Sequence, residues 1–403
     1  MEQVVLVRFG EIMLKGLNRH TFVERLAANI RRALSPLGRM RVVITQGRIF
    51  IVPREAGYDV RAAAEKVCSV FGVVSASVAY KTGKARGDIA EAAAAAARGY
   101  MEVNRPAAPG GLYAFKVETK RADKTYGRIS PVVSRDTGED LFLSTPGLTV
   151  DVNRPQFIVN VEIREDFAYV YTEKIAGFGG LPLGSNGKAL LLLSGGIDSP
   201  VAGFMMAKRG VTIEALHFYS YPYTNERSKD KVIKLCEILA GYCGTIALHI
   251  IPFTGVQEAL RDNCAEEYLT IVMRRTMMYI ANAVAAETSS QALVTGESMG
   301  QVASQTMQGL CVTDHAAEYP VFRPLIGLDK TEVIGYAVKI GTYETSILPY
   351  DDCCSLFSPK HPKTKPKLED ALYQESRISS LPELLRAAAA GRECVMVGPA
   401  AYI

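Results

Sequence analysis

The sequence lacks any apolar run long enough to span a membrane. Its run of four leucines, Leu190–Leu193, is followed within a few residues by Asp198, whereas a membrane-spanning helix needs about 20 apolar residues. The N-terminus also lacks a basic segment followed by an apolar one, so we expect no secretory signal. These two absences predict a cytoplasmic protein with no membrane anchor.

No Cys-x-x-Cys pair occurs among the eight cysteines, and no cysteine or histidine group has the spacing of a zinc site. We therefore assign no metal site from spacing and expect reduced thiols, most of them small core residues. The adjacent Cys353 and Cys354 are the exception. They follow two aspartates, whose negative charge would raise a thiol pKa.

Positive charge is scarce in the second half of the chain and concentrated in the first. Residues 1–180 hold 26 basic and 19 acidic side chains, whereas the rest holds 20 and 23. This imbalance favours a polyanion partner for the first half. A solvated basic surface without a partner is an equal alternative on charge alone.

A basic loop lies within that first half, at residues 120–128, directly after a predicted strand. Lys120, Arg121 and Lys124 would neutralise phosphates, and Tyr126 would stack on a base. An exposed charged turn is the alternative. The loop predicts RNA contacts.

Four segments divide the chain. Residues 1–60 read as a small α+β unit, with strands at 4–9, 41–44 and 48–52 and a helix at 21–34. Residues 61–175 read as a second unit, with a helix at 88–100, a strand at 112–119 and a hairpin near 157–170. Residues 176–187, which are rich in glycine, read as a linker. Residues 188–403 form the third unit.

The third unit has the α/β pattern. Strands are expected at 189–193, 211–217, 245–251 and 292–295, and helices at 199–209, 229–241 and 266–287. This alternation predicts a parallel sheet covered on both faces. Ligands bind such sheets beyond the carboxyl ends of the strands. The positions of interest are therefore those after each strand, including His217–Phe218 and Gly296–Ser298.

The segment Ser194–Ser199, with the sequence SGGIDS, follows the leucine strand and opens a helix. It lacks the lysine of the ordinary P-loop. Its glycines allow successive N–H groups to point at one anion, and the helix N-terminus adds its dipole. Asp198 would repel a bare phosphate, so it indicates either a bridging Mg²⁺ or a helix cap. This pattern resembles the PP-loop of ATP pyrophosphatases.

Three further stretches extend the resemblance to nearly the whole chain. They are FGEIMLKGLNRHTF (9–22), GESMGQVASQT (296–306) and the segment from Arg323 to Pro359. With these motifs the sequence resembles the ThiI-type tRNA 4-thiouridine synthetases. The resemblance implies an N-terminal ferredoxin-like domain, a THUMP domain and a C-terminal PP-loop domain of the adenine nucleotide alpha hydrolase type. The resemblance is to the short form of this family, so we expect no rhodanese domain.

The resemblance also implies functional residues. Those implied to bind ATP are Leu192, Leu193, Ser194, Gly195, Ser199, His217, Phe218, Arg274, Gly296 and Gln305. Lys330 is a candidate second cation for the polyphosphate. His217 has the alternative of a core histidine, and Arg275 that of a phosphate contact or a surface charge. Catalysis is expected from Asp198 and from Cys354, which would carry a persulfide, with Cys353 as a structural thiol or a backup.

The expected reaction is ATP- and Mg²⁺-dependent sulfur transfer to uridine 8 of tRNA. A cysteine desulfurase would supply the persulfide, and the family is also linked to the sulfur carrier protein of thiazole synthesis for thiamine. We expect a homodimer. Two alternatives stay open: an ATP pyrophosphatase acting on a small molecule, and a THUMP RNA-binding protein without catalysis.

Overall fold

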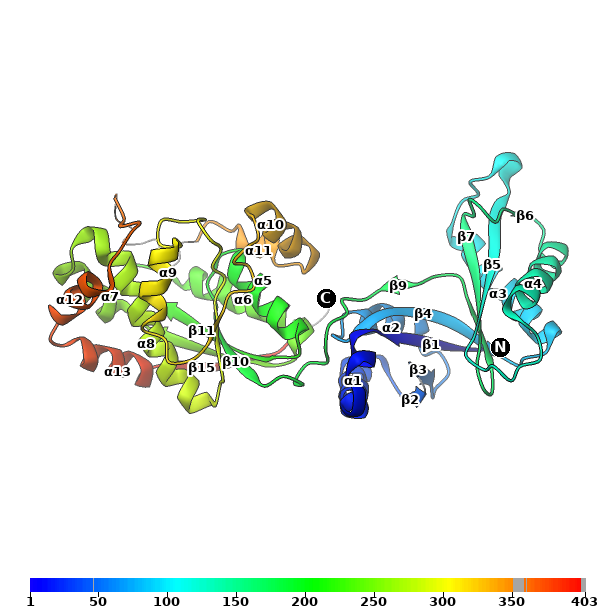
Figure 1. Cartoon of the computed structure of the whole chain (residues 1–403), viewed down its shortest axis with the longest axis horizontal. Helices are drawn as coiled ribbons and strands as arrows, with labels where there is room; N and C mark the ends of the chain where they lie inside the picture. Colours follow the sequence, from blue (N-terminus) through cyan, green and yellow to red (C-terminus); the bar gives the residue numbers. More distant parts are fainter. Residues whose placement is uncertain (46, 351–358, 360, 400–403) are drawn as a thin grey trace. The chain divides into compact units, whose positions relative to one another are not determined.

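The computed structural model describes residues 1–45, 47–350, 359 and 361–399. The chain divides into two compact units, Met1–Pro182 and Leu183–Ile403, and each is described by itself (Figure 1). None of the helices in the described ranges is long and apolar enough to cross a membrane.

The first unit is built on one sheet. Over the described residues it contains nine strands in the order β2-β3-β1-β4-β8-β7-β5-β6, with β9 beside β4. The strands are β1 (Glu2–Phe9), β2 (Met40–Thr45), β3 (Arg48–Pro53), β4 (Val73–Thr82), β5 (Tyr113–Arg121), β6 (Leu148–Val150), β7 (Phe157–Ile163), β8 (Ala168–Tyr171) and β9 (Ile175–Ala176). The α-helices are α1 (Arg19–Leu34), α2 (Val60–Cys68), α3 (Arg86–Val103) and α4 (Ser130–Ser144).

Helices cover two of the hydrophobic cores on this sheet, and a third core, which includes Phe50 and Tyr169, is formed by strand residues. In the first core, α1 and α2 pack on β1 and its neighbours through residues such as Leu26 and Val67. In the second, α3 and α4 pack on β5, β7 and β8 through residues such as Ala93 and Phe115. Strand β4 joins the two, because it pairs with β1 along most of its length and with β8 at its end. Since α2 and the start of β4 pack in the first core, that core extends beyond residue 60.

The glycine-rich stretch 176–187 begins as part of the first unit. The N–H groups of Gly177 and Gly179 donate to the carbonyls of Val74 and Val73, both at 2.8 Å. A Cβ on Gly177 would lie 2.3 Å from the Val73 oxygen, so only glycine fits there. Leu181 is buried in the first core. The chain therefore leaves this unit after residue 181.

The second unit is an α/β structure. In its described part, six strands pair in the order β14-β13-β10-β11-β12-β15. They are β10 (Lys188–Leu192), β11 (Thr212–Tyr219), β12 (Ile246–Pro252), β13 (Leu293–Val294), β14 (Val321–Phe322) and β15 (Glu393–Val397). The helices are α5 (Asp198–Lys208), α6 (Glu226–Cys243), α7 (Thr254–Asn263), α8 (Leu269–Thr288), α9 (Met307–Asp314), α10 (Lys330–Lys339), α11 (Tyr343–Ser346), α12 (Leu368–Ser376) and α13 (Leu381–Ala390).

Helices cover both faces of this sheet (Figure 1). Successive residues of β10 point to opposite faces: Leu190 packs in the cluster formed by α7, α8 and α13, whereas Leu191 lies against Gly203 of α5. The parallel sheet predicted from the sequence is confirmed for β10 to β14. The edge strand β15, which the sequence did not predict, pairs antiparallel with β12.

Candidate functional site

The loop between β10 and α5 is closed by its own serines. The Ser194 N–H donates to the Ser199 hydroxyl at 2.9 Å, and the Gly196 N–H donates to the Ser194 hydroxyl at 3.2 Å. The two hydroxyl oxygens are 3.2 Å apart. Ser199 is buried in the first turn of α5. The loop therefore has a defined curl at a helix N-terminus, which is the geometry of an anion site.

Gly296, at the end of β13, lies against this loop. A Cβ at that position would be 2.6 Å from the Ser199 nitrogen and 2.7 Å from the Asp198 carbonyl carbon. Both contacts are with backbone, which has no room to move. Any side chain at 296 would push β13 away from the start of α5.

A cavity of about 200 Å³ opens between these strand ends. It brings together all but one of the residues predicted to bind ATP, since Gly195 does not line it. Lining residues from that prediction are Leu192, Leu193, Ser194, Ser199, His217, Phe218, Arg274, Gly296 and Gln305, and Asp198 joins them. Leu216, Met277 and Met278 add an apolar wall that the motifs did not reveal.

His217 meets both descriptions considered for it. It is buried, and its Nδ1 lies 3.0 Å from the carbonyl oxygen of Leu193. It therefore ties the end of β11 to the start of the loop, as a hydrogen-bonded core histidine does. It also lines the cavity.

Asp198 is held by two side chains from later in the chain. Lys330 Nζ donates to Oδ1 at 2.6 Å, and Gln301 Nε2 donates to Oδ2 at 2.8 Å. Asp198 is not the helix cap that the sequence allowed, because the N-cap residue of α5 is Ile197. Lys330 thus contacts the loop through its hydrogen bond to Asp198. Over the described residues, no group of three or more His, Cys, Asp or Glu side chains could hold a metal ion.

Glu297 is a buried carboxylate between two arginines. Arg323 Nε donates to its Oε2 at 2.6 Å, and Arg274 Nη2 lies 2.5 Å from its Oε1. Burial would raise the pKa of Glu297, but the charges of Arg274 and Arg323 outweigh burial and hold it below the usual range. The sequence marked this position only as one that follows a strand. The two arginines come from distant segments, so no local pattern revealed the cluster.

Arg275 is neither a phosphate contact nor a surface charge, the two alternatives that the sequence suggested. It is fully buried, and its Nε donates to Glu375 at 2.6 Å and its Nη1 to the carbonyl oxygen of Val312 at 2.6 Å. A third contact runs to the Tyr279 hydroxyl at 2.7 Å. Arg275 is therefore a structural residue of the α8 core.

The basic loop of the first unit is partly tied down. Lys120 and Lys124 are exposed. The Arg121 Nη1 donates to the Tyr126 carbonyl oxygen at 2.8 Å, and the Tyr126 hydroxyl donates to the Lys84 carbonyl oxygen at 2.8 Å. Tyr126 is half-buried against the second core. Two cations are thus presented to solvent, while Arg121 and Tyr126 shape the loop.

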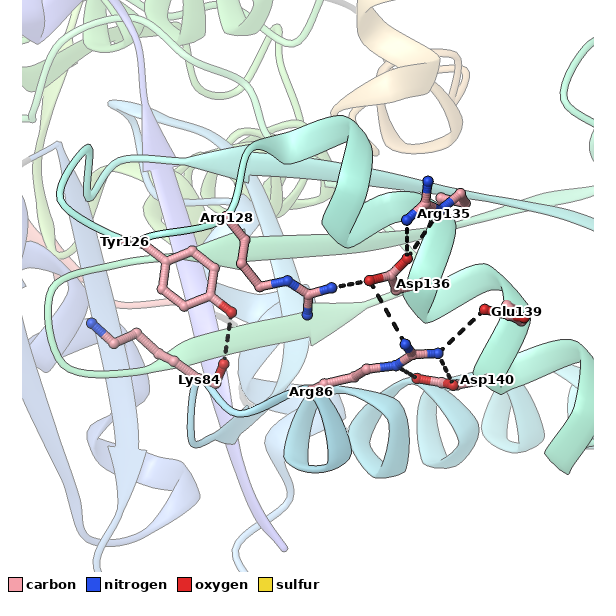
Figure 2. A network of polar contacts seen from close by, with 8 residues as sticks. All are labelled: Lys84, Arg86, Tyr126, Arg128, Arg135, Asp136, Glu139 and Asp140. Carbon is pink, nitrogen blue, oxygen red and sulfur yellow. Dashed lines mark hydrogen bonds and ion pairs between the residues drawn. The ribbon is translucent and has the colours of Figure 1, made fainter.

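Next to this loop, arginines converge on carboxylates in the middle of α4 (Figure 2). The buried Asp136 pairs with Arg128 and, at 2.9 Å, with Arg135. Arg86 pairs with Asp140 at 2.6 Å and with Glu139 at 3.3 Å. The cluster joins the start of α3 and the middle of α4 to the end of the loop. Its arginines are balanced by carboxylates, so it stabilises the loop's surroundings.

Cys353 and Cys354 lie outside the described residues. The remaining cysteines are free thiols, and burial raises the pKa of Cys236 and of Cys243 to about 12. Desolvation also raises the pKa of Cys264 to about 11. These three thiols are thus poor nucleophiles at neutral pH.

Together, the curled loop after β10, the cavity at the strand ends and the separate sheet unit with a basic loop define a class: a PP-loop nucleotide-binding domain joined to an RNA-binding module. Three family models match the chain: the ThiI ferredoxin-like domain at residues 4–77, the THUMP domain at 87–173 and the thiamine biosynthesis protein (ThiI) at 184–379. The chain belongs to the tRNA sulfurtransferase family, also called ThiI.

The similarity to curated relatives covers the full length. A probable tRNA sulfurtransferase of Acetivibrio thermocellus is 53% identical, over 98% of this chain and 99% of the relative. One of Moorella thermoacetica is 46% identical, over 99% of each. Among solved structures, a 4-thiouridine synthetase–RNA complex with bound ATP matches with a TM-score of 0.88 and 35% identity, over 98% of this chain and 100% of that one.

Proposed function

We propose that this protein transfers sulfur to tRNA in an ATP-dependent reaction and makes 4-thiouridine at position 8. The observation that carries the proposal is the cavity, where residues from the ends of β10, β11 and β13 and from α8 meet the loop 194–199. The family membership and the ATP-bound, RNA-bound neighbour support it. We place this reaction in the cytoplasm, where tRNA is modified.

The first step is adenylation. The uridine O4 attacks the α-phosphate of ATP, the bond to pyrophosphate breaks, and the base carries AMP on its oxygen. The N–H groups and hydroxyls of the loop bind phosphate oxygens, and the N-terminus of α5 stabilises their charge. The target base must leave its stack to reach the cavity.

We propose that Asp198 and Lys330 both serve the polyphosphate, Asp198 through a bound cation and Lys330 as a cation itself. Mg²⁺ would neutralise the polyphosphate, and Asp198 is the carboxylate placed to hold it once released from Lys330. Lys330, freed from Asp198, then turns its ammonium group to the phosphates. The ion pair thus keeps both side chains in position before the nucleotide binds.

The second step is sulfur transfer. The terminal sulfur of a persulfide on Cys354 attacks C4 of the adenylated uridine, and AMP departs with its oxygen, which leaves a disulfide between Cys354 and the base. A thiolate of an added reductant or of the desulfurase then attacks the Cys354 sulfur, so that the S–S bond breaks, 4-thiouridine is released and a new disulfide forms on Cys354. A cysteine desulfurase supplies the persulfide. The name of the matched family model supports a second acceptor, the sulfur carrier protein of thiazole synthesis. We also expect the enzyme to be a homodimer.

The contacts with tRNA are proposed for the basic loop of the first unit. Lys120 and Lys124 are exposed there, and Arg121 holds the loop's shape. Phosphate contacts from such side chains position the RNA without reading its sequence.

One reaction tests the function. The full chain is incubated with unmodified tRNA, Mg²⁺, ATP, cysteine and a cysteine desulfurase, and the nucleosides are separated and identified by mass. We expect 4-thiouridine only when ATP is present. AMP release that does not depend on tRNA and yields no 4-thiouridine would favour the small-molecule pyrophosphatase instead, and 4-thiouridine formed without ATP would contradict the adenylation step. RNA binding with neither product would favour the binding protein.

A further inference from the structure

Helix α6 presents two hydrogen-bond donors to the chain around α11. Lys231 Nζ donates to the carbonyl oxygen of Leu348 at 2.8 Å, and the Tyr242 hydroxyl donates to that of Ile340 at 3.2 Å. Lys231 and Tyr242 are about three helical turns apart, so both lie on one face of α6. Because α11 also packs on α6 (Figure 1), the chain is fixed to α6 before and after this short helix.

Lys231 lies deeper in the protein than most lysines do. Only 6% of its surface is exposed, and a lysine at that depth needs partners for its ammonium group. A methionine would fill a similar space but would leave the Leu348 carbonyl oxygen without this donor. The hydrogen bond therefore fixes where the backbone of Leu348 lies relative to α6.

The same segment also contacts the loop 194–199. Ser346, the last residue of α11, is buried, and its hydroxyl donates to the carbonyl oxygen of Gly196 at 3.4 Å. Cys354 comes six residues after Leu348 in the sequence, and a chain of that length extends at most about 20 Å. The place at which Leu348 is held thus limits how far from the loop the Cys354 thiol can lie.

Sulfur transfer depends strongly on such placement. The attacking sulfur and C4 of the adenylated uridine must approach to about 3–3.5 Å in the right direction before the bond forms. Adenylation takes place at the loop itself and does not need the cysteine. A residue that fixes only the chain leading to Cys354 would therefore affect the second step of the reaction and leave the first unchanged.

We propose that Lys231 is a positioning residue for sulfur transfer: by holding the Leu348 carbonyl group, it sets the point from which the chain brings Cys354 to the adenylated base. Tyr242 supports the same segment at Ile340. The inference rests on the proposed transfer of sulfur from Cys354, and it adds a residue of α6 that does not line the nucleotide cavity.

The test measures the two chemical steps separately in the full chain. Each protein is loaded with persulfide by a cysteine desulfurase, purified, and mixed with ATP, Mg²⁺ and tRNA. Pyrophosphate release reports adenylation. A denaturing quench with a thiol reductant frees the 4-thiouridine, which is identified by mass. Lys231→Met should release pyrophosphate at the wild-type rate but form 4-thiouridine roughly 10- to 100-fold more slowly, since a misplacement of about 1 Å can cost 100-fold.

Lys234→Met is the matched control. Lys234 lies on the same helix, is exposed and pairs with Glu237 at 2.9 Å, so this change removes the same charge without touching Leu348. It should match the wild type in both steps. Tyr242→Phe removes only the hydroxyl group that binds Ile340. It should slow 4-thiouridine formation roughly threefold or more, the size of one neutral hydrogen bond, and leave pyrophosphate release unchanged.

Wild-type rates of both steps in Lys231→Met would overturn the inference. An equal loss of both steps in a Lys231→Met protein that melts like the wild type would overturn it too. If Lys231→Met does not fold, Tyr242→Phe decides, and wild-type rates of both steps in that variant would overturn the inference. A wild-type protein that carries the persulfide and forms no 4-thiouridine would instead contradict the proposed function.

Discussion

At the scale of single residues, Asp198 is the point where three segments meet. It begins α5, and Lys330 and Gln301 reach it from beyond β14 and β13. The motif identified Asp198 but left its role between a metal ligand and a helix cap. The hydrogen bonds from Lys330 and Gln301 argue against the cap, and only the tertiary structure brings these two residues to Asp198.

Asp198→Ala should reduce tRNA-dependent AMP formation by at least about 100-fold, the order expected when a preorganised charge is removed from a reaction site. Binding of tRNA should be nearly unchanged, because the basic loop lies in the other unit. AMP release is measured with saturating tRNA, and RNA affinity by filter binding. Asp262→Ala, which changes an exposed aspartate beside Arg261, is the control. Full 4-thiouridine formation by Asp198→Ala would disprove its role.

Arg274 and Arg275 show why the sequence alone cannot predict the role of a single residue. They are adjacent on α8, and the helical period turns them about 100° apart. One therefore reaches the cavity, while the other is buried with Glu375. Both are arginines at neighbouring positions of the same helix, so the sequence gives no ground for assigning them different roles. Only the packing of α8 distinguishes the two.

At the scale of elements, strand β4 and its cross-strand partners hold the first unit together. Beside β4, the sheet carries a buried ion cluster: Glu162 on β7 pairs with Arg48 of β3 at 3.0 Å and with Arg164 at 2.6 Å. The Phe50 and Tyr169 rings stack 4.4 Å apart on the same side. These contacts join strands from both cores. The predicted strands located β3 and β7, but a pattern within one strand cannot show what lies across the three strands between them.

Glu162 should make the stability of the first unit depend on acid. Burial would raise the pKa of this carboxyl, but Arg48, Arg164 and Arg8 lower it below its usual range. The stabilisation is therefore present above the unfolded pKa of about 4.3 and is lost as the pH falls through the lower folded value. Glu162→Gln should lower the melting temperature at pH 7, and the difference from wild type should shrink as the pH falls below the unfolded pKa. A pH-independent difference would contradict this interpretation.

We expect the loop at residues 120–128 to contribute to tRNA binding mainly through its positive charge. Replacing Lys120, Arg121 and Lys124 by alanine should weaken tRNA binding and reduce the salt slope by roughly one for each phosphate that the loop no longer neutralises. ATP binding should stay the same. The control replaces Lys208, Lys234 and Arg386 in the second unit. Identical titrations of wild type and the loop variant at two salt concentrations would mean that the loop is only an exposed turn.

Elements were predictable where their pattern was local and strong. The strands β10, β11 and β12 and the helices α1, α3 and α6 all appear near their expected positions. The edge strand β15 was not predicted. A run of five residues after a helix gives no indication of the direction in which it pairs. Its antiparallel pairing with β12 depends on the whole path of the chain.

At the scale of the whole molecule, the sequence predicted the family and the fold class, and both are confirmed. The start of the linker was less predictable. Glycines 177 and 179 look like flexible chain, yet their N–H groups pair with β4. Glycine allows both a free linker and a close backbone contact, so composition cannot separate the two.

ATP-driven transfer of sulfur from Cys354 onto tRNA is the central claim about this molecule. The most direct test measures 4-thiouridine by mass in single-turnover reactions of wild type, Cys354→Ser and the matched Cys353→Ser, each with ATP, tRNA and a persulfide-loaded desulfurase. We predict product from wild type and substantial product from Cys353→Ser. Cys354→Ser should still bind ATP and tRNA but make none, because a serine hydroxyl cannot carry a persulfide. Normal product formation by Cys354→Ser would contradict the claim.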